Sequence, residues 1–434
     1  MTDPVSIIIL LGGFAVLMAL KVPVAFALAL SAFASAWYFG SGTAHFPIIV
    51  QRLVSGITPF NFMAIPFFII AGNLMGEGGI GKRMIDLADA LVGRVRGGLA
   101  MVNVLSSKFF GTVSGSVVAD TSALGTIMIP MMEKQGYDKE FATANTVTSS
   151  IVGLLIPPSH NMIIFAMAAG GGVSIAALFL AGIIPAIVLG IGLMIVSYII
   201  SVRKRYPKGK KYTFKDTLRL LWDGFLGLLT IVIIVGGITS GMFTATEASV
   251  IAVIYAFIIT FFVYREIPLS RFWHIMKKSV RTVAMVMAII AASSAFGYMM
   301  TILRVPDMAT SAILAITDNP WIILLLINVI LLVLGLVMDM APMILITTPI
   351  LLPVATEVVG MHPVQFGIVL LLNLGISLIT PPVGTVLFVG CSIGRTKIES
   401  VIKPLLPYYF VMILVLLLIT FVPMISMWLP DFFL

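Results

Sequence analysis

The sequence predicts an all-α polytopic membrane protein built as an inverted repeat, and three observations support this class. Of the 434 residues, 60% are hydrophobic and 10% are charged, and the mean hydropathy is +1.15. Because a soluble domain carries about 25% charged residues, this composition indicates many helical spans in a membrane. A Pro-Pro pair interrupts an apolar run once in each half, and the basic residues cluster in short loops.

The first part of the chain alternates apolar runs with polar connections. Val5–Leu20, Val22–Phe39 and Phe60–Met75 predict three spans, and Ser41–Pro59 predicts a polar loop before the third. Glu77–Gly97 is amphipathic and basic, so we expect it to lie along the membrane interface.

Gly98–Met131 predicts a re-entrant hairpin, residues 98–131. Both of its ends are apolar, whereas small and polar residues fill Gly111–Ser116 and Asp120–Ser122. Arms of about 15 residues are too short to cross a bilayer at about 1.5 Å per residue. A second hairpin is predicted at Trp321–Ala355, residues 321–355, with its tip near Asp339–Pro342.

Two broken helices follow the hairpins, at residues 141–170 and 363–392. Pro157-Pro158 interrupts the first and Pro381-Pro382 the second, and proline both lacks an N–H and clashes with the preceding turn. The unpaired backbone groups at such a break are tolerated only inside protein or beside a wet cavity. A kink required by packing is the alternative for one copy, but matching breaks in two halves are typical of a transporter's binding site.

The remaining segments complete two repeats of five spans and one hairpin each. The first repeat covers residues 1–202, a basic cytoplasmic linker covers 203–223, and the second repeat covers 224–434. The other predicted spans are Ser174–Ser201, Gly224–Phe243, Ala248–Val263, Thr282–Ile302 and Leu405–Trp428. Asp307–Asp318 predicts a short segment that does not span the membrane. With both termini periplasmic, 23 of the 26 Lys and Arg residues fall on the cytoplasmic side, as the positive-inside rule requires.

The tips and breaks supply candidate site residues, because backbone and hydroxyl oxygens suit Na⁺ and half-helix N-termini suit carboxylates. The predicted sodium ligands lie at both tips and both breaks: Ser114, Gly115, Ser116, Pro157, Pro158, Ser159, Met338, Asp339, Ala341, Thr380, Pro381 and Gly384. The predicted substrate contacts lie between the two tips: Ser116, Asp120, His160, Asn161, Asp339, Pro342 and Thr385.

Ionisable residues at membrane depth are functional candidates, each with a structural alternative. Lys108 and Asp120 lie on opposite arms of one hairpin and are able to form an ion pair instead. Asp339 is placed to cap the following half-helix. Glu247 forms a capping-box pattern with Thr244, which favours a structural role.

Other classes fit the sequence less well. The four histidines show no metal-ligand spacing, no nucleotide-binding loop is present, and the single Cys391 excludes an internal disulfide. We therefore expect no cofactor other than Na⁺ as a coupling ion, and no enzyme. The basic residues lie in short loops, which argues against nucleic acid. A proton-coupled anion transporter or an anion channel is the alternative.

Several motifs resemble one known family across essentially the whole chain. They are Ile65–Gly72, Ser114–Ser116 with Ala119–Thr121, Ile156–Ser159, Gly241–Ala248 and Ile379–Gly384. These are similar to the large membrane subunit of tripartite ATP-independent periplasmic (TRAP) transporters.

The resemblance implies an elevator-type sodium symporter of an organic anion in the bacterial inner membrane, with a fold like that of the ion-transporter superfamily. It also implies two partners: a small four-helix membrane subunit and a periplasmic substrate-binding protein. The sequence departs from the family at one point, since His160-Asn161 follow the first break where apolar residues are common. This departure favours a sialic acid or another sugar acid over a C4-dicarboxylate.

Overall fold

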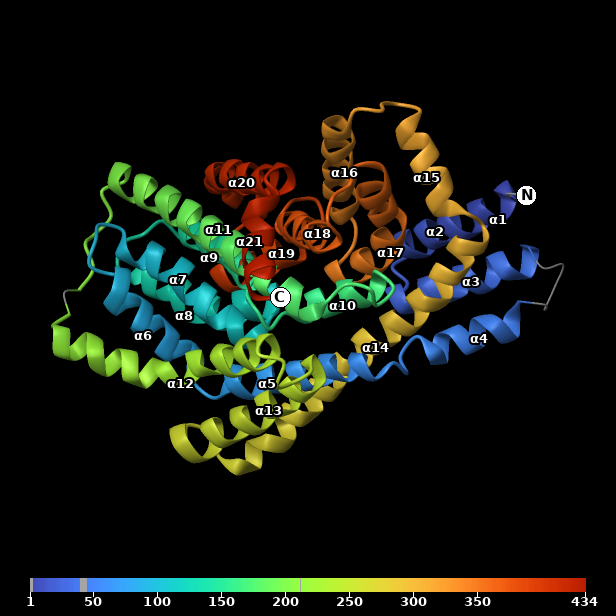
Figure 1. Cartoon of the computed structure of the whole chain (residues 1–434). Coiled ribbons are helices and arrows are strands. Elements are labelled where there is room, and N and C mark those ends of the chain that lie inside the picture. Colours follow the sequence, from blue (N-terminus) through green and yellow to red (C-terminus); the bar gives the residue numbers. More distant parts are fainter. Residues whose placement is uncertain (1–2, 40–44, 211) are drawn as a thin grey trace.

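Helices dominate the computed structural model, which describes residues 3–39, 45–210 and 212–434 (Figure 1). Within those ranges there is no β-strand, and a single isolated bridge pairs Arg96 with Lys208. The predicted all-α class is therefore confirmed. Residues 41–44 of the predicted polar loop and residue 211 of the predicted linker lie outside the described residues.

The first half runs from the N-terminus to the end of α11. A π-helical stretch, Ile8–Gly12, joins its first two helices, and a 3₁₀ turn, Phe60–Met63, precedes α5. Its helices are α1 (Pro4–Ile7), α2 (Gly13–Ala19), α3 (Val24–Phe39), α4 (Phe46–Ser55), α5 (Ala64–Glu77), α6 (Ile80–Val92), α7 (Gly98–Ser114), α8 (Val117–Lys134), α9 (Lys139–Leu154), α10 (His160–Ala168) and α11 (Ile175–Arg203).

The second half repeats this order of long helices, a short connecting helix, a helical pair and a broken helix. Two π-helical stretches, Ile259–Tyr264 and Val354–Val358, extend α13 and α17. Its helices are α12 (Phe214–Thr239), α13 (Ala245–Ile258), α14 (Phe272–Ile302), α15 (Val305–Leu314), α16 (Pro320–Gly335), α17 (Met340–Pro353), α18 (Pro363–Ser377), α19 (Thr385–Gly394), α20 (Ile398–Phe421) and α21 (Pro423–Phe433).

The number of helices that can cross a membrane differs from the prediction. In the described residues six helices are long and apolar enough, or seven if the bent pair α5–α6 counts as one span. This number is smaller than the ten predicted spans, two of which are the broken helices. Five of the six coincide with predicted spans, and the sixth, Met340–Val358, is an arm of the predicted second hairpin. The remaining predicted spans are not counted for one of two reasons. Some are too short, as α3 is with 16 residues where about 20 are needed, and in others a break divides the helix.

Three boundaries also differ from the prediction. The predicted polar loop contains α4, and the predicted last span ends at Phe421, because Pro423 begins a separate helix, α21. Helix α12 starts inside the predicted linker. Its capping box explains the early start: Thr213 Oγ1 accepts from the N–H of Asp216 at 3.3 Å, and the Asp216 carboxylate accepts from the N–H of Thr213 at 3.2 Å.

The molecule has a central bundle built around α9 and α18, beside a second group of long helices (Figure 1). Every residue from Phe141 to Leu154 in α9 and from Val364 to Ser377 in α18 is buried. Helices α7, α8, α11 and α20 pack on α9, and α16 and α20 pack on α18. In the second group α3, α4 and α5 pack against α14, and α5 also packs against α13.

Helix α6 forms an arm between the two groups. It bends from α5 by 68°, and Gly79 makes the bend with a left-handed φ of 75°. Just beyond it, Arg83 forms an ion pair with Glu266 at 2.6 Å and lies over the ring of Tyr264. At the other end of the arm, the hydroxyl of Tyr212 donates to Asp89 at 2.6 Å, which ties α6 to the linker. The arm is thus anchored at both ends.

Five non-glycine residues in the described ranges adopt a left-handed backbone, and all five are basic. They follow the C-terminal ends of helices: Lys21, Arg205, Arg265, Arg304 and Arg395. Glycine is the usual residue at such positions because it has no Cβ to clash. A cation there interacts favourably with the helix dipole and with the last carbonyl groups.

Replacing Gly79 by alanine is expected to lower the thermal midpoint of unfolding in detergent. The left-handed backbone adds about 1–2 kcal/mol of strain for a residue with a Cβ, and the new Cβ would also displace the Glu266 carboxylate that pairs with Arg83. Gly236→Ala is the matched control, since its Cβ would meet nothing within 4 Å and its helical φ accepts alanine. Equal midpoints for Gly79→Ala and the native protein would contradict this account of the bend.

Candidate functional site

The first hairpin tip touches the first helix break. Gly115 joins α7 to α8 with a left-handed φ of 57°. A Cβ on Gly115 would lie 2.8 Å from the carbonyl oxygen of Pro158 and 3.4 Å from Cα of Ser159. The structure therefore brings together the predicted groups Ser114–Ser116 and Pro157–Ser159, with room at the contact for glycine alone.

The first break leaves oxygen atoms without partners in a buried place. Pro157, Pro158 and Ser159 are all buried, and among the described residues the hydroxyl of Ser159 has no hydrogen-bond partner. No side chain caps α10, which starts at His160. At the tip, the hydroxyl of Ser116 accepts a long hydrogen bond, 3.4 Å, from the N–H of Ala119. Carbonyl and hydroxyl oxygens of this kind suit a cation such as Na⁺.

Asp120 lies in the interior rather than at the tip. Its side chain is 1% exposed, and neither carboxylate oxygen has a hydrogen-bond partner in the described part of the chain. It forms no ion pair with Lys108, so the structural alternative for these two residues is not supported. Helices α7 and α9 meet closely beside it, where a Cβ on Gly153 would lie 2.9 Å from Cα of Gly111 and 3.3 Å from Asp120 Oδ2.

The second tip and break are more open. The close contact lies before the tip, where a Cβ on Gly335 would meet the Ser377 side chain at 2.5 Å. Met338 and Ala341 are partly buried, and Asp339 is exposed. Asp339 makes no side-chain hydrogen bond to α17, so its predicted capping role is not supported.

The remaining predicted residues of the second half lie around the break. Pro342 and Gly384 are buried, Thr380 and Pro381 are partly buried, and the buried hydroxyl of Thr385 lacks a hydrogen-bond partner among the described residues. In the first half, Asn161 is buried and His160 partly buried, both in the first turn of α10.

Glu247 has the structural role that the sequence favours. Its carboxylate accepts from the N–H of Thr244 at 2.8 Å, and the Thr244 hydroxyl accepts from the N–H of Glu247 at 3.2 Å. Together they form the capping box of α13.

Buried amides hold the broken helices in place, and sequence reasoning missed them. Asn145 on α9 donates to Ser197 at 2.9 Å and to the hydroxyl of Tyr408 at 3.2 Å. On α18, Asn373 donates to the side-chain oxygen of Asn328 at 2.9 Å. An asparagine in an apolar run at membrane depth is the signal that would have found both, since an unpaired amide is costly there.

A further hydrogen bond satisfies a carbonyl group at the second break. The hydroxyl of Tyr409 on α20 donates to the carbonyl oxygen of Ile379 at 2.6 Å.

No group of three or more His, Cys, Asp or Glu side chains that would suit a metal is found within the described ranges.

Known proteins resemble this chain along most of its length. A family model described as "Tripartite ATP-independent periplasmic transporter, DctM component" matches residues 11–425. YgiK of Salmonella typhimurium is 44% identical, with 98% of each chain covered. The sialic acid TRAP transporter large permease protein SiaM of Vibrio cholerae is 38% identical, covering 88% of this chain and 89% of SiaM. The C4-dicarboxylate TRAP transporter large permease protein DctM of Pseudomonas aeruginosa is 37% identical, with 86% of each covered.

A solved structure shares the fold at low sequence identity. The YdaH transporter of Alcanivorax borkumensis aligns with a TM-score of 0.64 over 89% of each chain, at 13% identity. Such a likeness concerns the fold alone.

Replacing Tyr408 by phenylalanine is expected to lower the thermal midpoint of unfolding in detergent. The buried hydroxyl contacts Asn145 and Ser197, and leaving such partners unpaired costs about 1–3 kcal/mol. Tyr198→Phe is the control, because that side chain is 45% exposed and makes no described hydrogen bond. If both variants melt alike, the amide network does not hold α9 against α11 and α20.

Proposed function

Because the chain belongs to the DctM family of tripartite ATP-independent periplasmic transporters, we propose that it carries a small organic anion across the membrane by symport with Na⁺. It is a large permease subunit of such a transporter and not an enzyme. It has multiple apolar helices, as a multi-pass membrane protein requires.

The contact of Gly115 with the first break is the observation that carries sodium coupling. It brings the tip, with the partly buried Ser114 and Ser116, against the carbonyl group of Pro158 and the buried Ser159. The second tip and break, including Asp339 and Thr380, form the matching cation site in this proposal. Binding of Na⁺ at a tip would hold the hairpin against its broken helix, so the substrate site forms only when the ion is present.

Recurring helix contacts support an inverted repeat. By order along the chain, α13 is the counterpart of α3, and α14 is the counterpart of α5. Helix α3 packs on α14, and α13 correspondingly packs on α5. Likewise α8 packs on α19 and α10 packs on α17 (Figure 1). A pseudo-two-fold relation between residues 1–202 and 224–434 explains why these contacts occur in pairs.

The elevator motion follows from which helices are tied together. In our proposal the hairpins α7–α8 and α16–α17 and the broken helices α9–α10 and α18–α19 move as one body. Helices α11 and α20 move with them, because Ser197 and Tyr408 bind Asn145 inside the bundle. The frame then contains α3, α4, α5 and α12–α14, and the arms α6 and α15 connect it to the moving body.

The substrate in this proposal is an acid that bears several polar groups. His160 and Asn161 lie at the start of α10, next to the free end of that helix, which attracts a carboxylate. SiaM is named for sialic acid and DctM for C4-dicarboxylates, and the polar pair favours a sugar acid such as sialic acid. Asp120 is too enclosed for a substrate contact in this conformation, so we place the substrate nearer Ser116, Asp339 and Thr385.

Two partners complete the transporter in our proposal. A periplasmic binding protein captures the solute, and a small four-helix subunit supports the frame. The chain then lies in the bacterial inner membrane with the linker in the cytoplasm and both termini in the periplasm.

Uptake of sialic acid or succinate by the three-subunit complex in proteoliposomes is expected to fall to background when choline replaces Na⁺. The proposed sodium sites at the two hairpin tips require a small cation that hydroxyl and carbonyl oxygens coordinate directly, and choline is too large for this. Omitting the binding protein is the control for partner dependence. Undiminished uptake driven by a proton gradient alone would favour the proton-coupled alternative. Uptake that depends on neither a Na⁺ gradient nor a proton gradient would favour a channel.

Gly115→Ala is expected to lower the initial rate of Na⁺-dependent uptake about ten-fold or more. Its Cβ would push the tip away from the Pro158 carbonyl, and small misplacements of binding groups have large effects on rates. Gly297→Ala on α14, with nothing within 4 Å of its Cβ, is the matched control. Native rates and native Na⁺ dependence in Gly115→Ala would show that the first tip is not a sodium site.

A further inference from the structure

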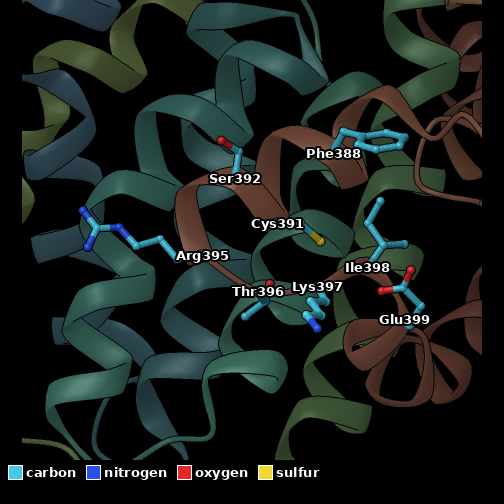
Figure 2. Close-up of a pocket in the computed structure, with 8 residues that line it drawn as sticks. All are labelled: Phe388, Cys391, Ser392, Arg395, Thr396, Lys397, Ile398 and Glu399. Carbon is cyan, nitrogen blue, oxygen red and sulfur yellow. The ribbon is translucent and has the colours of Figure 1, made fainter.

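A cavity lies at the end of α19 farthest from the second break, in the corner where α20 begins (Figure 2). Its volume is about 750 Å³, and Phe388, Cys391, Ser392 and the segment 395–399 line it. The proposed sodium and substrate sites include none of these residues.

An open stripe along α19 joins this cavity to the break. Thr385, Phe388 and Ser392 recur every three or four residues, so they share one face of the helix, and Arg395 follows just beyond its C-terminal end. Phe388 is 50% exposed, and Ser392 and Arg395 are exposed as well.

The opposite face of α19 is closed by close packing. A Cβ on Gly390 would meet Val147 of α9 at 2.1 Å, and one on Gly394 would meet the Thr143 hydroxyl at 2.2 Å. The stripe therefore lies on the side of α19 that faces away from α9.

The cavity carries an excess of positive charge. Arg395 and Lys397 are exposed at its rim, and neither forms an ion pair among the described residues. Glu399 is the only acidic residue in the lining, so the charge is +1 overall. Polar and charged side chains on the open face also argue against a surface that lies against lipid tails.

We propose that the stripe and the cavity form the exit path by which the organic anion leaves for the cytoplasm, with Arg395 and Lys397 receiving its carboxylate. This inference rests on the proposed function, because it takes the break at Thr385 as the point of departure. Exposed cations in water attract a carboxylate only weakly. That is enough to guide an anion outward and weak enough to let it go.

The first experiment measures which charged reagents reach the cavity. In a Cys391→Ser background, where no other cysteine remains, Ser392→Cys gives a single thiol on the stripe. We expect the anionic reagent sulfonatoethyl methanethiosulfonate to react about five-fold faster than its cationic trimethylammonioethyl counterpart, after correction for their rates with a free thiol. Arg395→Ala with Lys397→Ala should remove this preference, whereas Lys403→Ala, an exposed base outside the cavity, should leave it unchanged.

The second experiment asks whether blocking the path stops transport. Complete modification of Ser392→Cys by the anionic reagent should abolish Na⁺-dependent uptake by the three-subunit complex. Modification of Lys403→Cys in the same background should leave uptake intact. Equal reactivity towards both reagents, reaction with membrane-soluble maleimides only, or full modification with native uptake would each overturn the exit path. Absence of uptake before any modification would instead refute the proposed function, and the reagent preference would still test the cavity.

Discussion

The need to satisfy backbone polar groups inside a bilayer governs this structure. Each Pro-Pro pair removes N–H donors and leaves carbonyl groups free at mid-helix, and such groups are tolerated only within protein. The chain meets this need by burying nearly all of α9 and α18 and wrapping them in other helices. Buried amides on Asn145 and Asn373 then fix each broken helix to its neighbours, so the irregular segment is held by regular ones.

The two halves use the same devices to different extents. In the first half the tip lies directly on the break, and residues 155–159 are buried. Both halves have a close contact about one turn before the tip, between Gly111 and Gly153 in the first and between Gly335 and Ser377 in the second. The halves differ at the break itself, because Pro382 and Val383 of the second break are exposed. In the proposed inverted repeat, the two breaks are therefore buried to different extents. A transporter that exposes one site to two sides in turn requires such a difference at any moment.

Local signals in the sequence were sufficient for the irregular elements. The glycine and serine residues around Gly115 and the paired prolines predicted the helix ends correctly, because each acts on its own few residues of backbone. Span number was not predictable in this way, since α3 and α5 are short helices whose neighbours, not their length, keep them in the bundle.

Contacts between distant residues lay beyond sequence reasoning. Asn145 and Tyr408 are 263 positions apart, so nothing local links them. Asp120 and Lys108 occupy neighbouring arms, yet the hairpin turns their side chains to different surroundings. Whether two such residues meet is determined by how the helices pack, which local sequence patterns do not show.

The basic residues at left-handed helix ends reveal a conflict between how the chain is inserted and how tightly it folds. At Lys21, Arg205, Arg265 and Arg395, glycine would relax the backbone. In the orientation proposed above these loops are cytoplasmic, and their charges tell the insertion machinery which side should remain in the cytoplasm. The protein therefore keeps its orientation signals at places where they strain the folded state. Engineering for thermal stability that replaced them with glycine would improve the finished molecule while erasing part of the information used to assemble it.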